Sequence, residues 1–185
     1  MIQSKKRAFW IGASDTYYVM GNWDTKTWKE WWMEKLGIRT SDLNTKPMRV
    51  GNAYEHKIID FAVPGAEKDE QIVIPELSLR VNLDGRLGET IYEVKTYSAD
   101  SFKVSKRYWQ QAQAEMFALK QKELTPSLYI LAYHVGEAEY NNYFLNIEES
   151  KLSWHKILYD ESFEAEYVKR LQTLNECLKR GVIPR

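Results

Sequence analysis

One segment of the chain carries two carboxylates and an amine where they could meet, namely Asp84, Glu93 and Lys95. Residues two apart on a strand project to the same face, so Glu93 and Lys95 point together while Val94 faces the other way. A hairpin with its turn near residues 85–90 would bring Asp84 close to Glu93. Mg²⁺ prefers hard oxygen ligands of this kind and keeps several waters. The spacing therefore suits metal-assisted phosphodiester hydrolysis, in which the metal polarises the phosphate and acidifies a bound water.

The Glu-x-Lys pattern occurs three times and is weak by itself in a chain with 28% charged residues. The other two triplets begin at Glu55 and Glu149. Only the triplet at Glu93 lies inside an apolar strand-like segment, ETIYEVKTY, with an aspartate upstream at a strand end. Taken alone, Glu93 and Lys95 could instead form a salt bridge on a wet sheet face. In a hydrolytic site the lysine would orient the attacking water or neutralise charge that grows on the phosphate.

The elements that must hold these residues follow from apolar periodicity, capping residues and turn residues. Helices are predicted from Ser14 or Asp15 to Gly21, from Asp24 or Thr25 to Gly37, from Met48 to Ala62, over 103–122 and over 161–180. Strands are predicted over 71–83, 91–97, 127–135 and 142–148, with the turn segment DGRLGE between the first two. This order predicts one α/β domain over residues 1–185, with a central mixed sheet flanked by helices.

Composition narrows the class of protein. The chain has 185 residues, 44% of them apolar, and no apolar run approaches the length of about 20 residues that spans a bilayer. The first residues, MIQSKKRAFWIG, lack the apolar stretch of a signal peptide. Cys177 is the only cysteine, which excludes an internal disulfide and a cysteine-cluster metal site. A cytoplasmic setting without membrane contact is the expectation.

Charge is balanced over the whole chain and uneven along it. The 26 basic residues equal the 26 acidic ones, but the first fifty residues are basic and the next hundred are acidic. This pattern suits a protein that holds metal cations in one place and phosphates in another. The alternative is a solvated surface with charges of both signs in patches.

The chain resembles a known family at this point. The pattern Asp84-x8-Glu93-x-Lys95 is similar to the signature of the PD-(D/E)XK nucleases, with Leu83 in place of the proline. The surrounding segments resemble the YqaJ-type, phage lambda-type exonucleases, in the same order along residues 7 to about 120. These segments are RAFWIGASD, TWKEWWMEKLGI, GNAYEH and YWQQAQAEMFAL. The resemblance implies the restriction-endonuclease-like fold of the PD-(D/E)XK enzymes.

The resemblance also implies which residues perform catalysis. Asp84, Glu93 and the backbone carbonyl of Val94 would ligate the metal. Glu55, in the segment GNAYEH, would approach the same site from its helix as a further ligand. Lys95 would position the attacking water.

Four further residues receive roles from the resemblance alone. Arg7 and Ser14 would contact a phosphate near the DNA end. Gln113, on the helix that follows the core strands, would support the catalytic site. Gln111, two residues earlier on that helix, would contact the substrate.

The function implied by the resemblance is that of a DNA exonuclease. It would depend on Mg²⁺, with Mn²⁺ as a substitute, and would resect double-stranded DNA from 5′ ends during phage or prophage recombination in a bacterial host cell. Implied partners are double-stranded DNA ends, a phage single-strand annealing protein and further copies of the chain in a ring trimer. Alternatives are another PD-(D/E)XK nuclease of endonuclease or resolvase type, and a non-catalytic DNA-binding module. The intact catalytic residues argue against that module.

Overall fold

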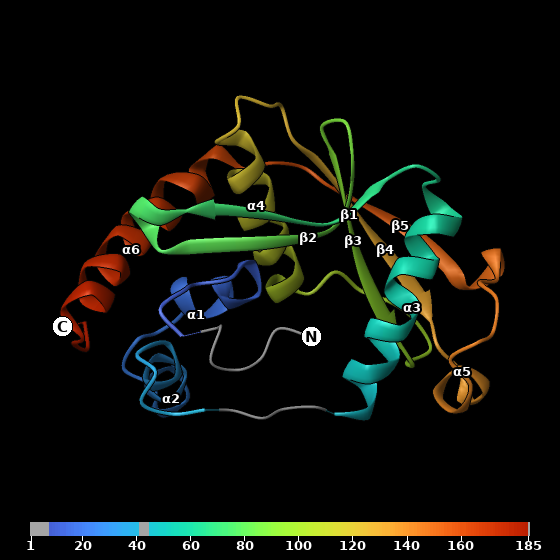
Figure 1. Ribbon diagram of the computed structural model, residues 1–185, viewed down its shortest axis with the longest axis horizontal. Coiled ribbons are helices and arrows are strands. Elements are labelled where there is room, and N and C mark those ends of the chain that lie inside the picture. The colour runs from blue at the N-terminus through green and yellow to red at the C-terminus, as the bar shows by residue number, and fades with distance from the viewer. Residues whose placement is uncertain (1–7, 41–44, 185) are drawn as a thin grey trace.

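A five-stranded mixed sheet forms the centre of the computed structural model, which describes residues 8–40 and 45–184 (Figure 1). The strands lie in the order of the sequence: β1 (Glu67–Ile74), β2 (Leu79–Leu87), β3 (Thr90–Tyr97), β4 (Ser127–His134) and β5 (Leu152–Ile157). Neighbouring strands are antiparallel except β3 and β4, which are parallel. A parallel pair needs a crossover connection, and helix α4 (Lys106–Lys120) supplies it.

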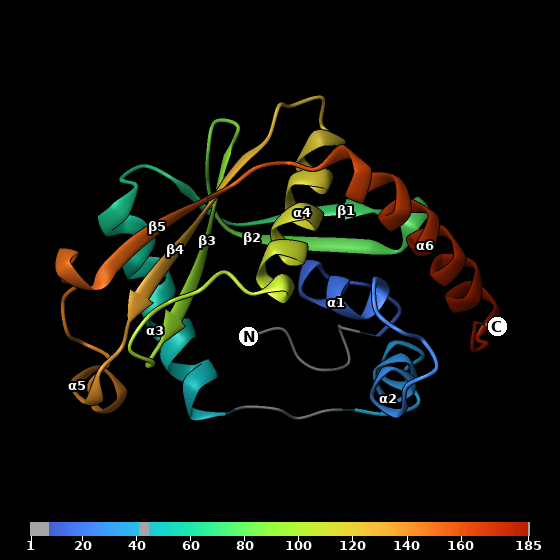
Figure 2. The same cartoon turned by 180° about the vertical axis from the view of Figure 1, so that it is seen from behind.

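The helices form two groups around the sheet. Helices α1 (Thr16–Val19), α2 (Lys26–Lys35), α4 and α6 (Glu161–Arg180) gather on one side, whereas α3 (Lys46–Ala62) and α5 (Glu137–Asn141) lie on the other (Figures 1 and 2). Each group buries its own apolar cluster against the sheet. The predicted architecture, a central mixed sheet flanked by helices, is confirmed.

Local signals in the sequence place most helix ends correctly. The side chain of Thr25 accepts a hydrogen bond from the backbone N–H of Trp28 and caps α2. Gly181 ends α6 in the left-handed conformation, with φ of 66°. The side chains of Trp28, Trp31 and Trp32 are buried and pack against one another, as their spacing on one helix face predicts.

The prediction of one strand over 71–83 is wrong. The structure has two strands there, separated by a short 3-10 turn at Pro75–Leu77. Proline has no N–H for a strand ladder, and the turn is held on α6, where Asn175 donates to the carbonyl of Glu76 at 2.8 Å. The following hairpin is also tighter than predicted. Strand β2 continues through Leu87, so the turn consists of Gly88 and Glu89.

The predicted strand over 142–148 is wrong as well. This segment is an irregular stretch after α5, and the edge strand is β5, which begins at Leu152. Side chains of α3 donate hydrogen bonds to backbone carbonyls of the irregular segment. Tyr54 donates to the carbonyl of Asn142, and Lys57 donates to those of Tyr143 and Leu145. Backbone carbonyls that accept hydrogen bonds from side chains are less available to pair with a neighbouring strand.

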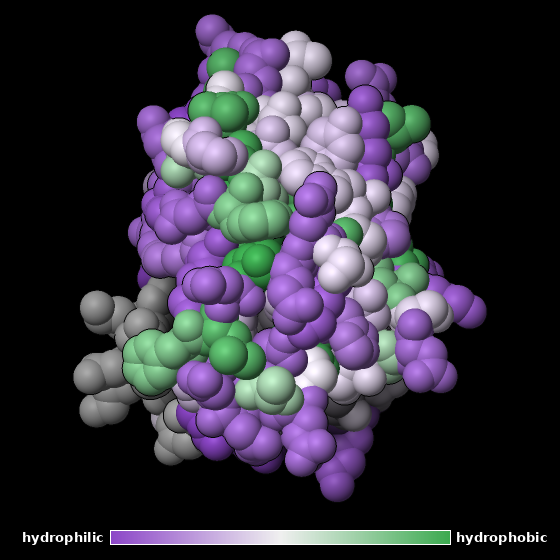
Figure 3. All heavy atoms as spheres, turned by 90° about the vertical axis from the view of Figure 1, so that its right-hand side faces the viewer, coloured by the Kyte–Doolittle hydropathy of each residue, from purple (hydrophilic) through white to green (hydrophobic). Residues whose placement is uncertain are grey.

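The surface over α3 and α5 is mainly hydrophilic, with a broken band of apolar side chains (Figure 3). Exposed apolar residues occur on α3 and in the loop after α5, among them Met48, Phe61 and Phe144. Within residues 8–40 and 45–184, no helix has the length and apolar character that a membrane crossing requires.

Candidate active site

The sheet opens at Asp84, and its side chain bridges the opening. The ladder between β2 and β3 extends from Leu87–Thr90 to Gly85–Tyr92. One residue further along β2, Oδ2 of Asp84 accepts a hydrogen bond from the backbone N–H of Val94 at 2.8 Å. The Asp84 side chain thus provides the next hydrogen bond between β2 and β3 after the backbone ladder ends. Its carboxylate is fixed beside β3 at the point where the two strands separate.

Gly85 allows helix α3 to approach this opening. A Cβ at Gly85 would lie 3.2 Å from the side chain of Ile59, so β2 and α3 are in close contact there. Glu55 precedes Ile59 by one helical turn and lies on the same face of α3. The glycine after Asp84 therefore brings the helix that carries Glu55 next to the carboxylates of the sheet.

Helix α4 closes the site from the other side with residues of one helix face. Gln111 is central, because its Oε1 accepts from Nζ of Lys95 at 3.2 Å and its Nε2 donates to Oε1 of Glu93. The same Nε2 donates to Oε1 of Glu115 at 2.8 Å. Lys95 also donates to Oε1 of Glu93 and lies 5.2 Å from the centre of the Tyr108 ring. The amine is thereby fixed between strand β3 and helix α4.

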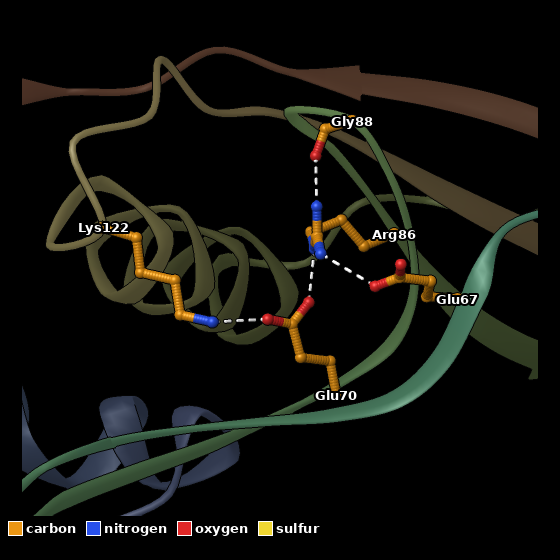
Figure 4. Close-up of polar contacts among 5 residues, drawn as sticks. All are labelled: Glu67, Glu70, Arg86, Gly88 and Lys122. Carbon is orange, nitrogen blue, oxygen red and sulfur yellow. Dashed lines mark hydrogen bonds and ion pairs between the residues drawn. The ribbon is translucent and has the colours of Figure 1, made fainter.

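An ion network anchors the far end of the hairpin (Figure 4). Arg86, two residues after Asp84, donates to the carbonyl of Gly88 at 2.6 Å and to Glu67 at 2.9 Å. It also pairs with Glu70 on β1, which in turn accepts from Lys122 beyond α4. The network ties the hairpin turn and β1 to the segment that follows the crossover helix.

Three acids of the site, Asp84, Glu115 and Glu55, have raised pKa values. Burial, followed by the charges of Glu93 and Glu55, raises the pKa of Asp84 well above its ordinary value. Burial and then Glu93 raise the pKa of Glu115 and that of Glu55 in the same direction. Burial lowers the pKa of Lys95, but Glu93 and Asp84 outweigh it and raise the pKa overall. Crowded negative charge of this kind is what a bound cation relieves.

The donor set fits a hard divalent cation. Oε2 of Glu93 is buried and has no hydrogen-bond partner among the described residues, and the same is true of Oε2 of Glu115. Buried carboxylate oxygens normally have partners, so the two free atoms require an explanation. Asp84 and Glu55 add two further carboxylates to the cluster, and the charges of Glu93 and Glu55 both act on Asp84. Carboxylate oxygens in this number suit Mg²⁺ or Mn²⁺.

A histidine and a second aspartate flank this cluster on the side of α3. Glu55, His56 and Asp69 each offer one ligand atom, and these atoms lie within 4.8 Å of one another. Nε2 of His56 already pairs with Oδ2 of Asp69 at 3.0 Å, and both side chains are exposed.

The structure brings together five of the residues that the sequence singles out: Asp84, Glu93, Lys95, Glu55 and Gln111. It does not place Gln113 with them. Both polar atoms of the Gln113 amide bind the segment before α6: Nε2 donates to the carbonyl of Leu158 at 2.7 Å, and Oε1 accepts from the N–H of Asp160 at 2.9 Å. Residues two apart on a helix do not face the same way, so Gln111 and Gln113 could not both reach the site.

Ser14 lies in a cleft beside the cluster. This cleft has a volume of about 130 Å³, and its lining includes Ser14, Lys35, Arg80 and Gln111. Gln111 belongs to both the cleft and the carboxylate cluster, so the two are adjacent. Arg7, the expected partner of Ser14 at a terminal phosphate, lies outside the described residues.

Sequence reasoning missed Glu115. The side chain is fully buried on α4, four residues after Gln111 and on the same helix face. The signal that could have found it is a glutamate inside the apolar stretch AEMFAL, since charged residues are rarely buried without a partner.

The chain is similar in structure to solved exonucleases. It matches an alkaline exonuclease from Laribacter hongkongensis with a TM-score of 0.68 and 16% identity, over 95% of this chain and 90% of that one. It also matches a phage related exonuclease from Haemophilus somnus with a TM-score of 0.66 and 14% identity, over 96% and 98% of the two chains. No protein-family model matches the chain, and no curated protein does. At these identities the likeness establishes the fold, which is the restriction-endonuclease-like fold expected from the sequence.

Proposed function

We propose that this chain is a Mg²⁺-dependent exonuclease, with Mn²⁺ as a substitute, that resects double-stranded DNA from 5′ ends. The observation that carries the proposal is the arrangement of Asp84, Glu93 and Lys95. Two carboxylates and a fixed ammonium group meet where the β2–β3 hairpin opens, on a fold shared with solved exonucleases.

The proposed ligands of the metal are Asp84, Glu93, Glu55 and the backbone carbonyl of Val94. When bound, such an ion supplies Lewis acidity toward the phosphate and lowers the pKa of a coordinated water. The hydrogen bond from the N–H of Val94 orients the Asp84 carboxylate before any ligand arrives. A carboxylate fixed in this way loses little freedom on binding, which favours catalysis.

Lys95 is the proposed group that acts on the attacking water or on the phosphate. Its Nζ is fixed by Glu93, by the amide oxygen of Gln111 and by the face of the Tyr108 ring. An ammonium group in this place can donate to an oxygen on which negative charge develops. Gln111 orients the lysine through its Oε1, so its proposed role extends from substrate contact to positioning.

Recognition of the DNA end is assigned to Arg7 and Ser14. The cleft that contains Ser14 supports this part of the proposal, because Gln111 joins it to the carboxylate cluster. A guanidinium group offers a fork of donors that matches a terminal phosphate.

The proposed setting is phage or prophage recombination in the cytoplasm of a bacterial host. The phage related exonuclease among the structural neighbours supports this setting. A single-strand annealing protein would receive the resected strand, and copies of the chain would assemble into a ring trimer around the DNA.

Digestion of end-labelled linear duplex and of closed circular duplex tests the function. In Mg²⁺ the linear duplex should lose nucleotides from its 5′ ends while the circle survives, and excess EDTA should stop the reaction. Cleavage of the circle would indicate an endonuclease. Inertness toward both substrates would indicate a binding module, and robust cleavage in EDTA would exclude a metal-dependent site.

A further inference from the structure

Glu115 is a buried acid for which the proposed mechanism has no use. Its side chain is fully buried, and its neighbours Ala114 and Met116 on α4 are buried too. Burial of a carboxylate is costly unless a cation or hydrogen bonds compensate for the lost water. Among the described residues, Glu115 forms no ion pair, because Nζ of Lys95 is bonded to Glu93 and Gln111 instead.

Glu93 and Glu115 share a single amide group. Nε2 of Gln111 donates to Oε1 of both carboxylates, which brings the strand residue and the helix residue close together. The other oxygen of each, Oε2, is buried and has no hydrogen-bond partner within the described part of the chain. A cation that contacts both carboxylates would compensate for their like charges and would give each free oxygen a partner.

We propose that Glu115 is a further ligand of the divalent metal, which its Oε2 binds together with Oε2 of Glu93. This inference rests on the proposed function, since it concerns the same metal site. The crossover helix α4 then contributes directly to metal binding, in addition to its contact with the lysine. The proposed site thus has one carboxylate ligand more than a site formed by Asp84, Glu93 and Glu55 alone.

The alternative role for Glu115 is that of a neutral acid whose proton bridges to Glu93. A glutamine at position 115 separates the two roles, because an amide keeps the shape and a donor but binds a divalent cation poorly. The Glu115→Gln variant should therefore bind Mn²⁺ about 10- to 100-fold more weakly than the wild type by calorimetric titration of the full chain. The increase in melting temperature that Mn²⁺ causes should shrink in parallel.

Glu139→Gln is the matched control. Glu139 is buried as well, but its two oxygens are occupied by the N–H of Gly136 and by Nζ of Lys151. This variant should keep the Mn²⁺ affinity of the wild type, although it loses an ion pair. Asp84→Asn serves as the second reference, since loss of a proposed core ligand should weaken Mn²⁺ binding too.

The results separate the two levels of the proposal. Wild-type Mn²⁺ affinity in a folded Glu115→Gln variant would show that Glu115 is a structural acid and would overturn the inference. Failure of the wild type itself to bind Mn²⁺ would overturn the proposed function. If the glutamine variant does not fold, Glu115→Asp keeps the charge but withdraws it by one methylene group. Wild-type affinity in that variant would also count against the inference, and weakened binding would support it.

Discussion

At the scale of single residues, Asp84 both joins two strands and contributes a carboxylate to the site. The Asp84→Asn variant should lose cleavage activity, because an amide does not replace a metal-binding carboxylate. Its fold should remain intact, since the amide oxygen can still accept from the N–H of Val94. Circular dichroism and melting in EDTA would check the fold, and digestion of linear duplex in Mg²⁺ would check activity. Retention of activity in this variant would exclude Asp84 from catalysis.

The acids of the site also predict how stability depends on pH. The pKa values of Asp84, Glu115 and Glu55 are raised in the folded chain, so the folded state binds more protons than the unfolded one. Their contribution to stability is therefore present at mildly acidic pH and is lost as pH rises through the folded pKa values. In EDTA, the wild type should lose melting temperature relative to Asp84→Asn as pH rises above the ordinary carboxyl pKa range.

Saturating Mg²⁺ should reverse this trend, because a divalent cation favours the ionised carboxylates. Parallel melting curves for wild type and Asp84→Asn across this pH range in EDTA would contradict the electrostatic account of the cluster.

Residue spacing was enough to predict the part of the site that lies on a strand, but not the part that lies on helix α4. Glu93 and Lys95 lie two apart on a strand, where local geometry alone fixes their common face. Gln113 and Glu115 lie on a helix whose orientation depends on packing against β2 and α6. The sequence alone does not show which face of α4 meets the carboxylates. Glu115 was overlooked for this reason, and the amide of Gln113 is bonded to the segment before α6.

At the scale of elements, the approach of α3 to β2 at Gly85 sets the position of Glu55. A Gly85→Ala change puts a methyl group 3.2 Å from Ile59. The overpacking should cost about 1–3 kcal/mol of stability. It should also weaken Mn²⁺ binding, because the helix that carries Glu55 must move. Thermal melting and calorimetric titration would measure the two effects.

Gly51→Ala is the control for this change. Gly51 lies on α3 itself, and a Cβ there would meet only Oγ1 of Thr96, at 3.4 Å. Alanine is a better helix former than glycine, so this variant should be as stable as the wild type or slightly more so. Equal Mn²⁺ affinity in both alanine variants would show that the Gly85 contact does not position Glu55.

The elements themselves were predictable where local signals dominate. The cap at Thr25 and the glycine at position 181 fixed helix ends without help from tertiary structure. The strand predicted over 71–83 ignored the break at Pro75, and the docking of that turn on α6 involves Asn175, a hundred residues later. Strand β5 was missed because LSWHKI alternates poorly, and its place at the sheet edge is set by β4.

At the scale of the whole molecule, the order of elements was enough to predict the fold class, but not the pairing of the strands. A chain with no net charge that acts on DNA must gather the basic side chains that bind phosphate in one place. The proposed site for the terminal phosphate, near Ser14, is such a place. The enzyme should therefore prefer 5′-phosphorylated over 5′-hydroxyl duplex ends. Arg7→Ala should erase this preference, whereas Arg39→Ala, which removes an exposed partner of Glu30, should not. Equal rates on both ends for the wild type would remove the role assigned to Arg7.

The measurement that tests the central claim most directly is a paired one on Lys95→Ala, with turnover in Mg²⁺ and DNA affinity in Ca²⁺. If Lys95 acts in the transition state, its loss should reduce turnover by about 10²–10³-fold. DNA affinity should change much less, because phosphate binding comes from many contacts. If Lys95 is only the salt-bridge partner of Glu93, the change should cost up to about 1 kcal/mol of stability and little turnover. Near-normal turnover in a folded Lys95→Ala variant would contradict the assignment of this site as a nuclease centre.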